Sequence, residues 1–262
     1  MNDKQRVACA STALLALSAL TALPASCAHA ASPPAPRGWF DPGGDAAYSH
    51  AAIDACEAAP ANTAGFAFAS PNRKRRIAAR PAPEGDVTLY TVADDDGRES
   101  IVDTAAWNCP EIGWSPTSDR FFVTYSDGGL VGAYKVSAYR ILAGRWEHLD
   151  VGDHVRRDFM RGYPKCFDPE TPNLFGVAWS SDGRRLLVAA QVLNHSNCDD
   201  MGTFKLYEVA VPGGAILHRY SQLEAKAAFY GVLGPGLRAA DDACLTHPGS
   251  CHVPMLHGRG NH

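Results

Sequence analysis

The chain has 262 residues, of which 46% are hydrophobic, and a formal net charge of −4 at pH 7. This composition is that of a globular protein and is too apolar for a wholly disordered chain. The slight excess of acidic residues argues against a nucleic-acid binder, which usually presents a basic face, and against binding to membranes through positive charge. The length suits one domain, or at most two.

The first thirty residues have the pattern of a secretory signal peptide. Basic residues precede an apolar run from Val7 to Leu23, and Ala28-His29-Ala30 follows as a small-x-small cleavage site. We therefore expect residues 1–30 to be removed and the protein to be periplasmic or secreted. The residues before Cys27 do not match a lipobox, so no lipid anchor is expected there. No later segment is apolar enough to span a bilayer.

Six cysteines follow the expected cleavage site. An even number of cysteines in an exported chain indicates disulfide bonds, each of which would stabilise the fold by about 2–4 kcal/mol. The pairing stays open, although a bond across the Pro248-Gly249 turn is the easiest to form. The predicted disulfide cysteines are Cys56, Cys109, Cys166, Cys198, Cys244 and Cys251.

Three segments between residues 65 and 222 share one plan. Each has a short apolar strand, a serine followed by turn-forming residues, and a second apolar run. The serines are Ser70, Ser115 and Ser180. In each segment a third strand, a further turn and a fourth strand follow in the same register, so we expect four strands joined by hairpins in every copy.

Four consecutive strands joined by hairpins form one blade of a β-propeller. The turns Ser70-Pro71-Asn72-Arg73, Ser115-Pro116-Thr117-Ser118-Asp119 and Ser180-Ser181-Asp182-Gly183-Arg184 resemble the Ser-Pro-Asp-Gly-Lys element of TolB-like propeller repeats, which are similar to WD-type blades. The first copy lacks the glycine, the second changes the order of the turn residues, and the third has serine in place of proline. The resemblance implies an all-β, propeller-like fold, with an antiparallel β-sandwich as the alternative.

The predicted blades cover residues 65–105, 111–150 and 174–222. Three blades cannot close a ring, so a fourth could come from residues 39–60 together with 225–240; otherwise loops, disulfides or another protein must cover the sheet edges. Residues 31–64 form an N-terminal segment, and residues 223–262 form a C-terminal segment with a flexible tail. Residues 152–173 are expected to be an inserted surface loop.

This inserted loop combines arginines with aromatic residues, the residue types that dominate interface hot spots. If the aromatic side chains pack on the propeller instead, they belong to its core. The predicted binding residues are Arg156, Arg157, Phe159, Tyr163 and Phe167.

Motifs of enzymes and metal sites are missing from the sequence. It has no Gly-x-Ser-x-Gly elbow, Walker loop, dinucleotide fingerprint or His-Glu-x-x-His helix, so we predict no catalytic residue, metal ligand or cofactor. The C-terminal tail is the best metal candidate, but its histidine spacing suits neither a helix nor a zinc finger. The basic run Arg73–Arg76 is expected at an exposed hairpin tip, where it could dock an acidic partner or a phospholipid headgroup.

The resemblance to TolB-like propellers implies scaffolding in the cell envelope or protein–protein interaction. We therefore expect an exported binding module, either a scaffold or an inhibitor, whose partner is an envelope or secreted protein. The first alternative is a periplasmic hydrolase or lyase with its site on the propeller face, for which Asp153, His154 and His195 are candidates. The second alternative is a metal-binding protein.

Overall fold

The computed structural model describes most of the chain after residue 34. Every structural statement below concerns these residues, which are 35–55, 67–81, 88–105, 108–126, 133–162, 171–193 and 200–242. The expected signal peptide lies outside them. So do all the predicted disulfide cysteines except Cys109, of which only the backbone is described. Within the described ranges, no helix has the length and apolar character needed to cross a membrane.

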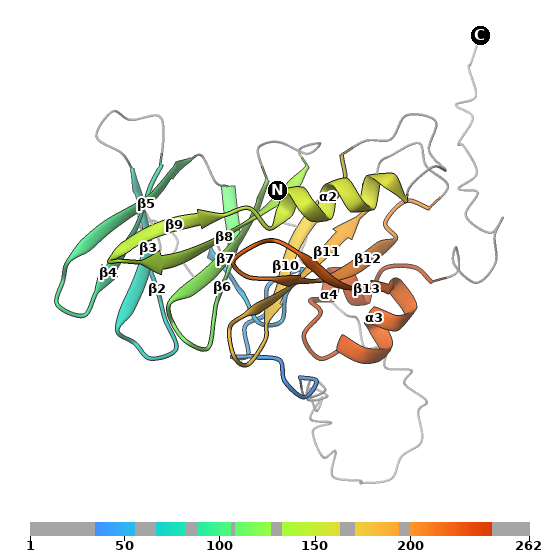
Figure 1. Cartoon of the computed structure of the whole chain (residues 1–262), viewed down its shortest axis with the longest axis horizontal. Helices are drawn as coiled ribbons and strands as arrows, with labels where there is room; N and C mark the ends of the chain where they lie inside the picture. Colours follow the sequence, from blue (N-terminus) through green and yellow to red (C-terminus); the bar gives the residue numbers. More distant parts are fainter. Residues whose placement is uncertain are drawn as a thin grey trace, which may run out of the picture. The chain divides into compact units, whose positions relative to one another are not determined.

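Strands make up three antiparallel sheets, which we call blades 1, 2 and 3 (Figure 1). Blade 1 contains β2 (Ala67–Ala69), β3 (Arg75–Pro81), β4 (Thr88–Asp94) and β5 (Glu99–Ala105). Blade 2 contains β6 (Asn108–Trp114), β7 (Arg120–Ser126), β8 (Tyr134–Leu142) and β9 (Arg145–Leu149). Blade 3 contains β10 (Asn173–Trp179), β11 (Arg185–Gln191), β12 (Phe204–Ala210) and β13 (Ile216–Ser221). The predicted all-β, propeller-like build is confirmed, because every blade consists of four strands that are consecutive in sequence.

The three serine turns share one backbone conformation although their sequences differ. In each turn the serine N–H donates to the carbonyl of the residue five positions later, at 2.8 to 2.9 Å. The residue three positions after the serine has a positive φ of 60° at Arg73, 60° at Ser118 and 68° at Gly183. Glycine adopts this conformation freely, whereas a side chain there costs about 1 kcal/mol. The predicted register is therefore confirmed, and loss of the glycine does not change the turn.

Each pair of neighbouring blades buries a hydrophobic core between them. Trp114 and Phe121 lie between blades 1 and 2, and Phe122 and Trp179 lie between blades 2 and 3. The two tryptophans also bond to the preceding blade. The Trp114 indole N–H donates to the Phe68 carbonyl at 3.4 Å, and that of Trp179 donates to the Gly113 carbonyl at 3.0 Å. The same position in successive repeats therefore supplies both core volume and a specific contact between blades.

The ring of Phe122 requires glycine on two sides. A Cβ atom at Gly113, its partner across blade 2, would lie 2.4 Å from the ring, and a Cβ atom at Gly176 in blade 3 would also lie 2.4 Å from it. Both distances are far below van der Waals contact. The two glycines lie on β6 and β10, the first strands of blades 2 and 3, which we call their inner strands. They let a whole phenyl ring fill the space between these two strands.

The expectation of a surface loop at residues 152–173 is wrong for its first part. Residues Gly152–Arg161 form helix α2, which packs on β8 and β11. Val155 and Phe159 are buried in the core between blades 2 and 3. With Val151 they follow an i, i+4, i+8 spacing that marks one apolar face of a helix. That periodicity was the signal for the helix in the sequence.

The possible fourth blade from residues 39–60 and 225–240 is not formed by the described residues of these segments. Trp39 pairs with Ser180 beside β10, and β1 (Ile53–Asp54) pairs with β6. The N-terminal segment therefore lies along the inner strands of blades 3 and 2. On the C-terminal side the chain forms α3 (Gln222–Phe229), which starts with a capping box, and α4 (Pro235–Arg238).

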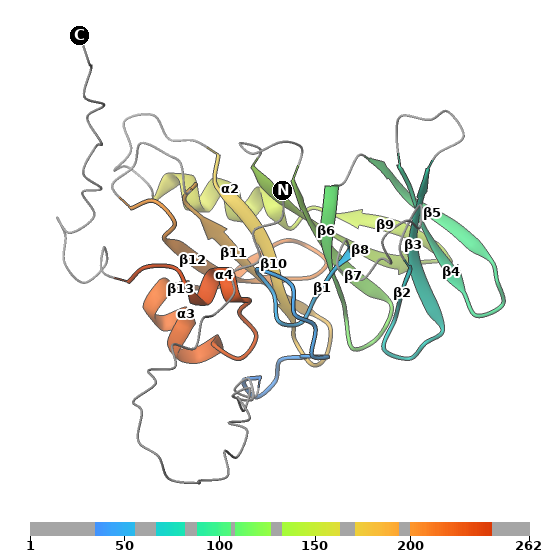
Figure 2. The ribbon, with the colours of Figure 1, turned by 180° about the vertical axis from the view of Figure 1, so that it is seen from behind.

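These helices cover one end of the stack of blades. Phe229 and Leu237 belong to a core that also contains Phe175, Leu187 and Leu206 of blade 3. Figures 1 and 2 show blade 1 on one side of blades 2 and 3, with α3 and α4 on the opposite side. The stack therefore runs from blade 1 through blades 2 and 3 to the helices.

Replacing either Trp114 or Trp179 by alanine should lower the free energy of unfolding by about 3–5 kcal/mol, because both side chains are at most 2% exposed and would leave cavities. Chemical denaturation of the purified variants measures this loss. Leu217→Ala is the control, since Leu217 is 44% exposed, and it should change stability by less than about 0.5 kcal/mol. Losses below about 1 kcal/mol at both tryptophans would contradict the repeat alignment.

Candidate functional site

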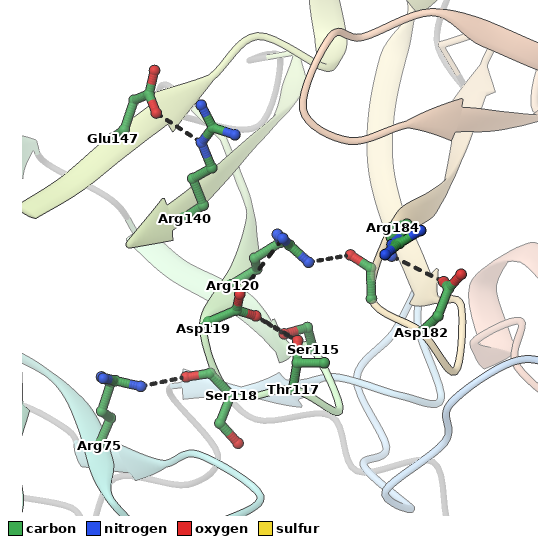
Figure 3. A network of polar contacts seen from close by, with 11 residues as sticks. Arg75, Ser115, Thr117, Ser118, Asp119, Arg120, Arg140, Glu147, Asp182 and Arg184 are labelled. Atoms are coloured by element: carbon green, nitrogen blue, oxygen red, sulfur yellow. Dashed lines mark hydrogen bonds and ion pairs between the residues drawn. The ribbon is translucent and has the colours of Figure 1, made fainter. Parts of the chain in front are cut away.

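Arginines lock the blades together at their serine turns (Figure 3). Arg75, five residues after the serine of blade 1, donates from Nη1 to the Ser118 carbonyl of blade 2 at 3.1 Å. Arg120, at the same position in blade 2, donates to the Gly183 carbonyl of blade 3 at 2.8 Å. Both acceptors belong to the residue with positive φ. The positions of neighbouring blades are therefore fixed by a repeated contact from side chain to backbone.

Among the described residues no blade follows blade 3, and the N-terminal segment takes that place. Arg185, the equivalent arginine, bonds Glu208 of its own blade at 2.6 Å, and its guanidinium lies 5.4 Å from the ring centre of Trp39. The Ser181 N–H donates to the Gly38 carbonyl at 2.8 Å. This end of the stack is thus closed by the protein's own residues.

The opposite end of the stack is the outer face of blade 1, the face turned away from blade 2. On β3, Ile77 and Ala79 point into the core while Arg76, Ala78 and Arg80 point away from it. Among the described residues, no helix or strand packs on this face. The outer face consists of Ala67, Ala69, Arg76, Ala78, Arg80, Leu89, Thr91, Ala93, Glu99 and Ile101.

The centre of this face is polar and its edge is apolar. Glu99 accepts a hydrogen bond from Thr91 at 2.6 Å and pairs with Arg80 at 2.7 Å. The Thr91 hydrogen bond, followed by the contacts with Arg80, lowers the pKa of the Glu99 carboxyl. Beside them on the edge strand β5, Ile101 is 64% exposed, more than any other large hydrophobic side chain in the described part of the chain.

A groove of about 500 Å³ lies between the β2–β3 turn and the β4–β5 turn at one end of blade 1, and the Arg75–Asp94 ion pair is part of its lining. The first turn lines it with Arg73, Lys74 and Arg76, for which the structure gives no ion pair with a described residue. Asp95 and Glu99 line the other side. Basic and acidic walls therefore face each other across the groove.

A second cavity, of about 390 Å³, lies where α2 meets blade 2 and contains one predicted binding residue. Arg156 lines it and pairs with Asp153 at 2.6 Å, and His148 and Lys135 contribute further polar groups. Asp153, named above as a catalytic candidate, is thus in a cavity. The other catalytic candidates are not brought to it: His154 is exposed on α2, and His195 lies outside the described ranges.

The other predicted binding residues that the structure describes do not lie together on one surface. Arg157 is exposed on α2. Phe159 is only 3% exposed, which corrects its assignment as a binding residue, because its ring is part of the core beneath the helix. Tyr163 and Phe167 lie outside the described residues, as does the histidine-rich tail. Elsewhere, the described residues hold no group of three or more potential metal ligands.

Glu111 is a buried carboxyl that sequence reasoning missed. It lies on the inner strand β6, is 4% exposed, and accepts a hydrogen bond from the Tyr48 N–H at 3.1 Å. Burial, together with the negative charge of Asp54, its direct partner across the β1–β6 pair, outweighs the backbone hydrogen bonds from Tyr48 and Ala47 and raises its pKa to about 8. Glu111 is therefore mostly protonated at neutral pH and ties the N-terminal segment to blade 2. No residue pattern in the sequence marks it.

Comparisons with known proteins add little to this picture. Neither a protein-family model nor a curated protein matches the chain. One solved structure to which the chain is similar is described as that of "putative TolB from Agrobacterium tumefaciens", with 14% sequence identity and a TM-score of 0.32. The match covers 62% of this chain and 52% of that one, so the chain spans about half of that protein's length. The fold assignment rests on the strand order and the repeated turns.

Arg120→Met should lower the free energy of unfolding by about 1–3 kcal/mol, because the Gly183 carbonyl loses its donor from the neighbouring blade. Arg140→Met is the matched control, since Arg140 is similarly buried but pairs only with Glu147 of its own blade (Figure 3). That change should cost less than about 1 kcal/mol. Equal losses in the two variants, measured by chemical denaturation, would argue against a locking role for Arg120.

Glu111→Gln should remove a pH dependence of stability. The folded protein keeps the Glu111 proton up to about pH 8, while the unfolded chain releases it near 4.5, so wild-type stability should fall as the pH rises between these values. The glutamine variant lacks this component. Denaturation midpoints at several pH values from 5 to 9 test this, with the exposed Glu147→Gln as control. A glutamine variant as sensitive to pH as the wild type would contradict the assignment.

Proposed function

We propose that the protein is an exported protein-interaction module that docks its partner on the outer face of blade 1. The observation that carries this proposal is the difference between the two ends of the stack. The hydrophobic face of blade 3 is covered by α3, α4 and the N-terminal segment, whereas no described element covers the outer face of blade 1. A sheet face left at the end of a stack is where a further layer from another protein can pack.

The character of the outer face supports a reversible contact. An exposed isoleucine lies beside the Arg80–Glu99–Thr91 hydrogen bonds, and small alanine side chains between them let another surface approach closely. The arginine contact from Arg75 to blade 2 holds the face in place before binding, which reduces the entropy lost on association. Export rests on the signal-peptide pattern of residues 1–30 and places the partner in the envelope or outside the cell.

The inner strands support binding at the end of the stack over chemistry at its centre. A propeller enzyme would need space beside the inner strands of its blades for a substrate. Here residues 39–54 pair with β10 and β6, and Ser49 bonds the Val177 carbonyl at 2.5 Å. The space beside the inner strands of blades 2 and 3 is thus filled by residues 39–54 of the chain itself.

Photo-crosslinking in the native host tests the docking surface. A photoreactive residue at Ile101 should capture one dominant protein, and the same residue at Leu223 on α3, 45% exposed, should not. Binding of the captured protein should then be reproduced with purified components and weakened by Ile101→Asp but not by Leu223→Asp. Equal capture at both positions, or none at Ile101 in folded protein, would overturn the proposal.

A further inference from the structure

We infer that the partner docked on the outer face of blade 1 is a second copy of this chain, related by a two-fold axis that runs along the strands between β3 and β4. This inference rests on the proposed function, because it names the occupant of the same surface. It is carried by the charges on the two turns that border the groove and by the covered state of the opposite end of the stack.

The two turns have opposite charge and lie side by side. The strand order β2-β3-β4-β5 brings the β2–β3 and β4–β5 turns to the same end of blade 1, with the groove between them. The first turn carries Lys74, and Arg76 follows at the start of β3. The second turn carries Asp95 and Asp96, while the guanidinium of Arg98, at the end of this turn, lies on the side of blade 2 near Gly144. The surface is therefore divided into a basic half and an acidic half.

A two-fold axis along the strands matches these halves. Rotation by 180° about such an axis turns the outer face onto itself, keeps the turns at the same end and reverses the order of the strands. The basic β2–β3 turn of one copy then faces the acidic β4–β5 turn of the other, and the reverse contact forms on the far side of the axis. An interface between identical patches must be self-complementary in this way.

The mixed charge favours a second copy over an acidic partner protein. The cations of the groove are accompanied by Asp95 and Glu99, which would repel an acidic segment laid along it. Like charges in contact are costly, whereas a second copy presents a cation to Asp95, and Glu99 already pairs with Arg80 of its own blade. The small side chains of Ala69, Ala78 and Ala93 allow two sheets to stack at the usual distance of about 10 Å.

The ends of the stack explain why such an assembly would stop at two copies. Head-to-tail growth would require the outer face of blade 3, which α3 and α4 cover. A two-fold contact through blade 1 uses the one blade face that no described element covers and leaves helices at both ends. The closed dimer therefore has no further blade face to offer.

Charge reversal on the two turns tests the inference with full-length mature protein. The wild type should be a dimer in sedimentation experiments, and the dimer should weaken as salt is added. An acidic variant, Lys74→Glu with Arg76→Glu, and a basic variant, Asp95→Lys, should each dimerise at least about tenfold more weakly alone. An equal mixture of the two should recover the dimer, because opposite charges then meet on both sides of the axis.

Arg184→Glu is the matched control, since Arg184 holds in blade 3 the turn position that Lys74 holds in blade 1. It should leave the dimer unchanged. A monomeric wild type, or a dimer that ignores both reversals, would overturn the inference. If Ile101 then captures a different protein, such as an acidic one, the proposed docking function stands and only the identity of the partner is wrong. If Ile101 captures nothing, both proposals fall.

Discussion

The structure depends on one constraint: a four-stranded blade has two faces, and a face rich in large apolar side chains must be covered. Blade 2 is covered on both sides, by blades 1 and 3, and the buried tryptophans Trp114 and Trp179 lie at these two junctions. The tryptophans bond backward and Arg75 and Arg120 bond forward, so each junction is held from both sides. The faces at the two ends of the stack then require different solutions.

The two ends of the stack of blades therefore differ in how their outer faces are covered. At blade 3, the residues that follow the last strand form α3 and α4, and their apolar side chains complete a core. At blade 1 the outward positions hold mainly alanine, threonine and charged residues, with Leu89 and Ile101 as the large apolar side chains. A face of this kind is stable in water without a covering layer, because most of its side chains are small or polar.

The sequence predicted the blades because local rules decide them. Strand alternation and the serine turns gave the four-stranded plan in every repeat, even where Arg73 or Ser118 replaces the glycine. Helix α2 was not predicted, because its many arginines and aspartates are also typical of a surface loop, and only the spacing of Val151, Val155 and Phe159 indicates a helix. The outer face of blade 1, the buried Glu111 and the path of residues 39–54 depend on long-range packing. No local pattern records which face of a strand meets another blade.

The arginine contacts between blades have a consequence for how the repeats change over evolutionary time. Their acceptors at Ser118 and Gly183 are main-chain carbonyls, which every amino acid possesses. A turn can therefore exchange its side chains freely while the junction persists, provided that the backbone can still adopt a positive φ. The arrangement of the blades therefore does not depend on the side chains at the tips of the turns, and the copies can differ in sequence while they keep the same backbone conformation.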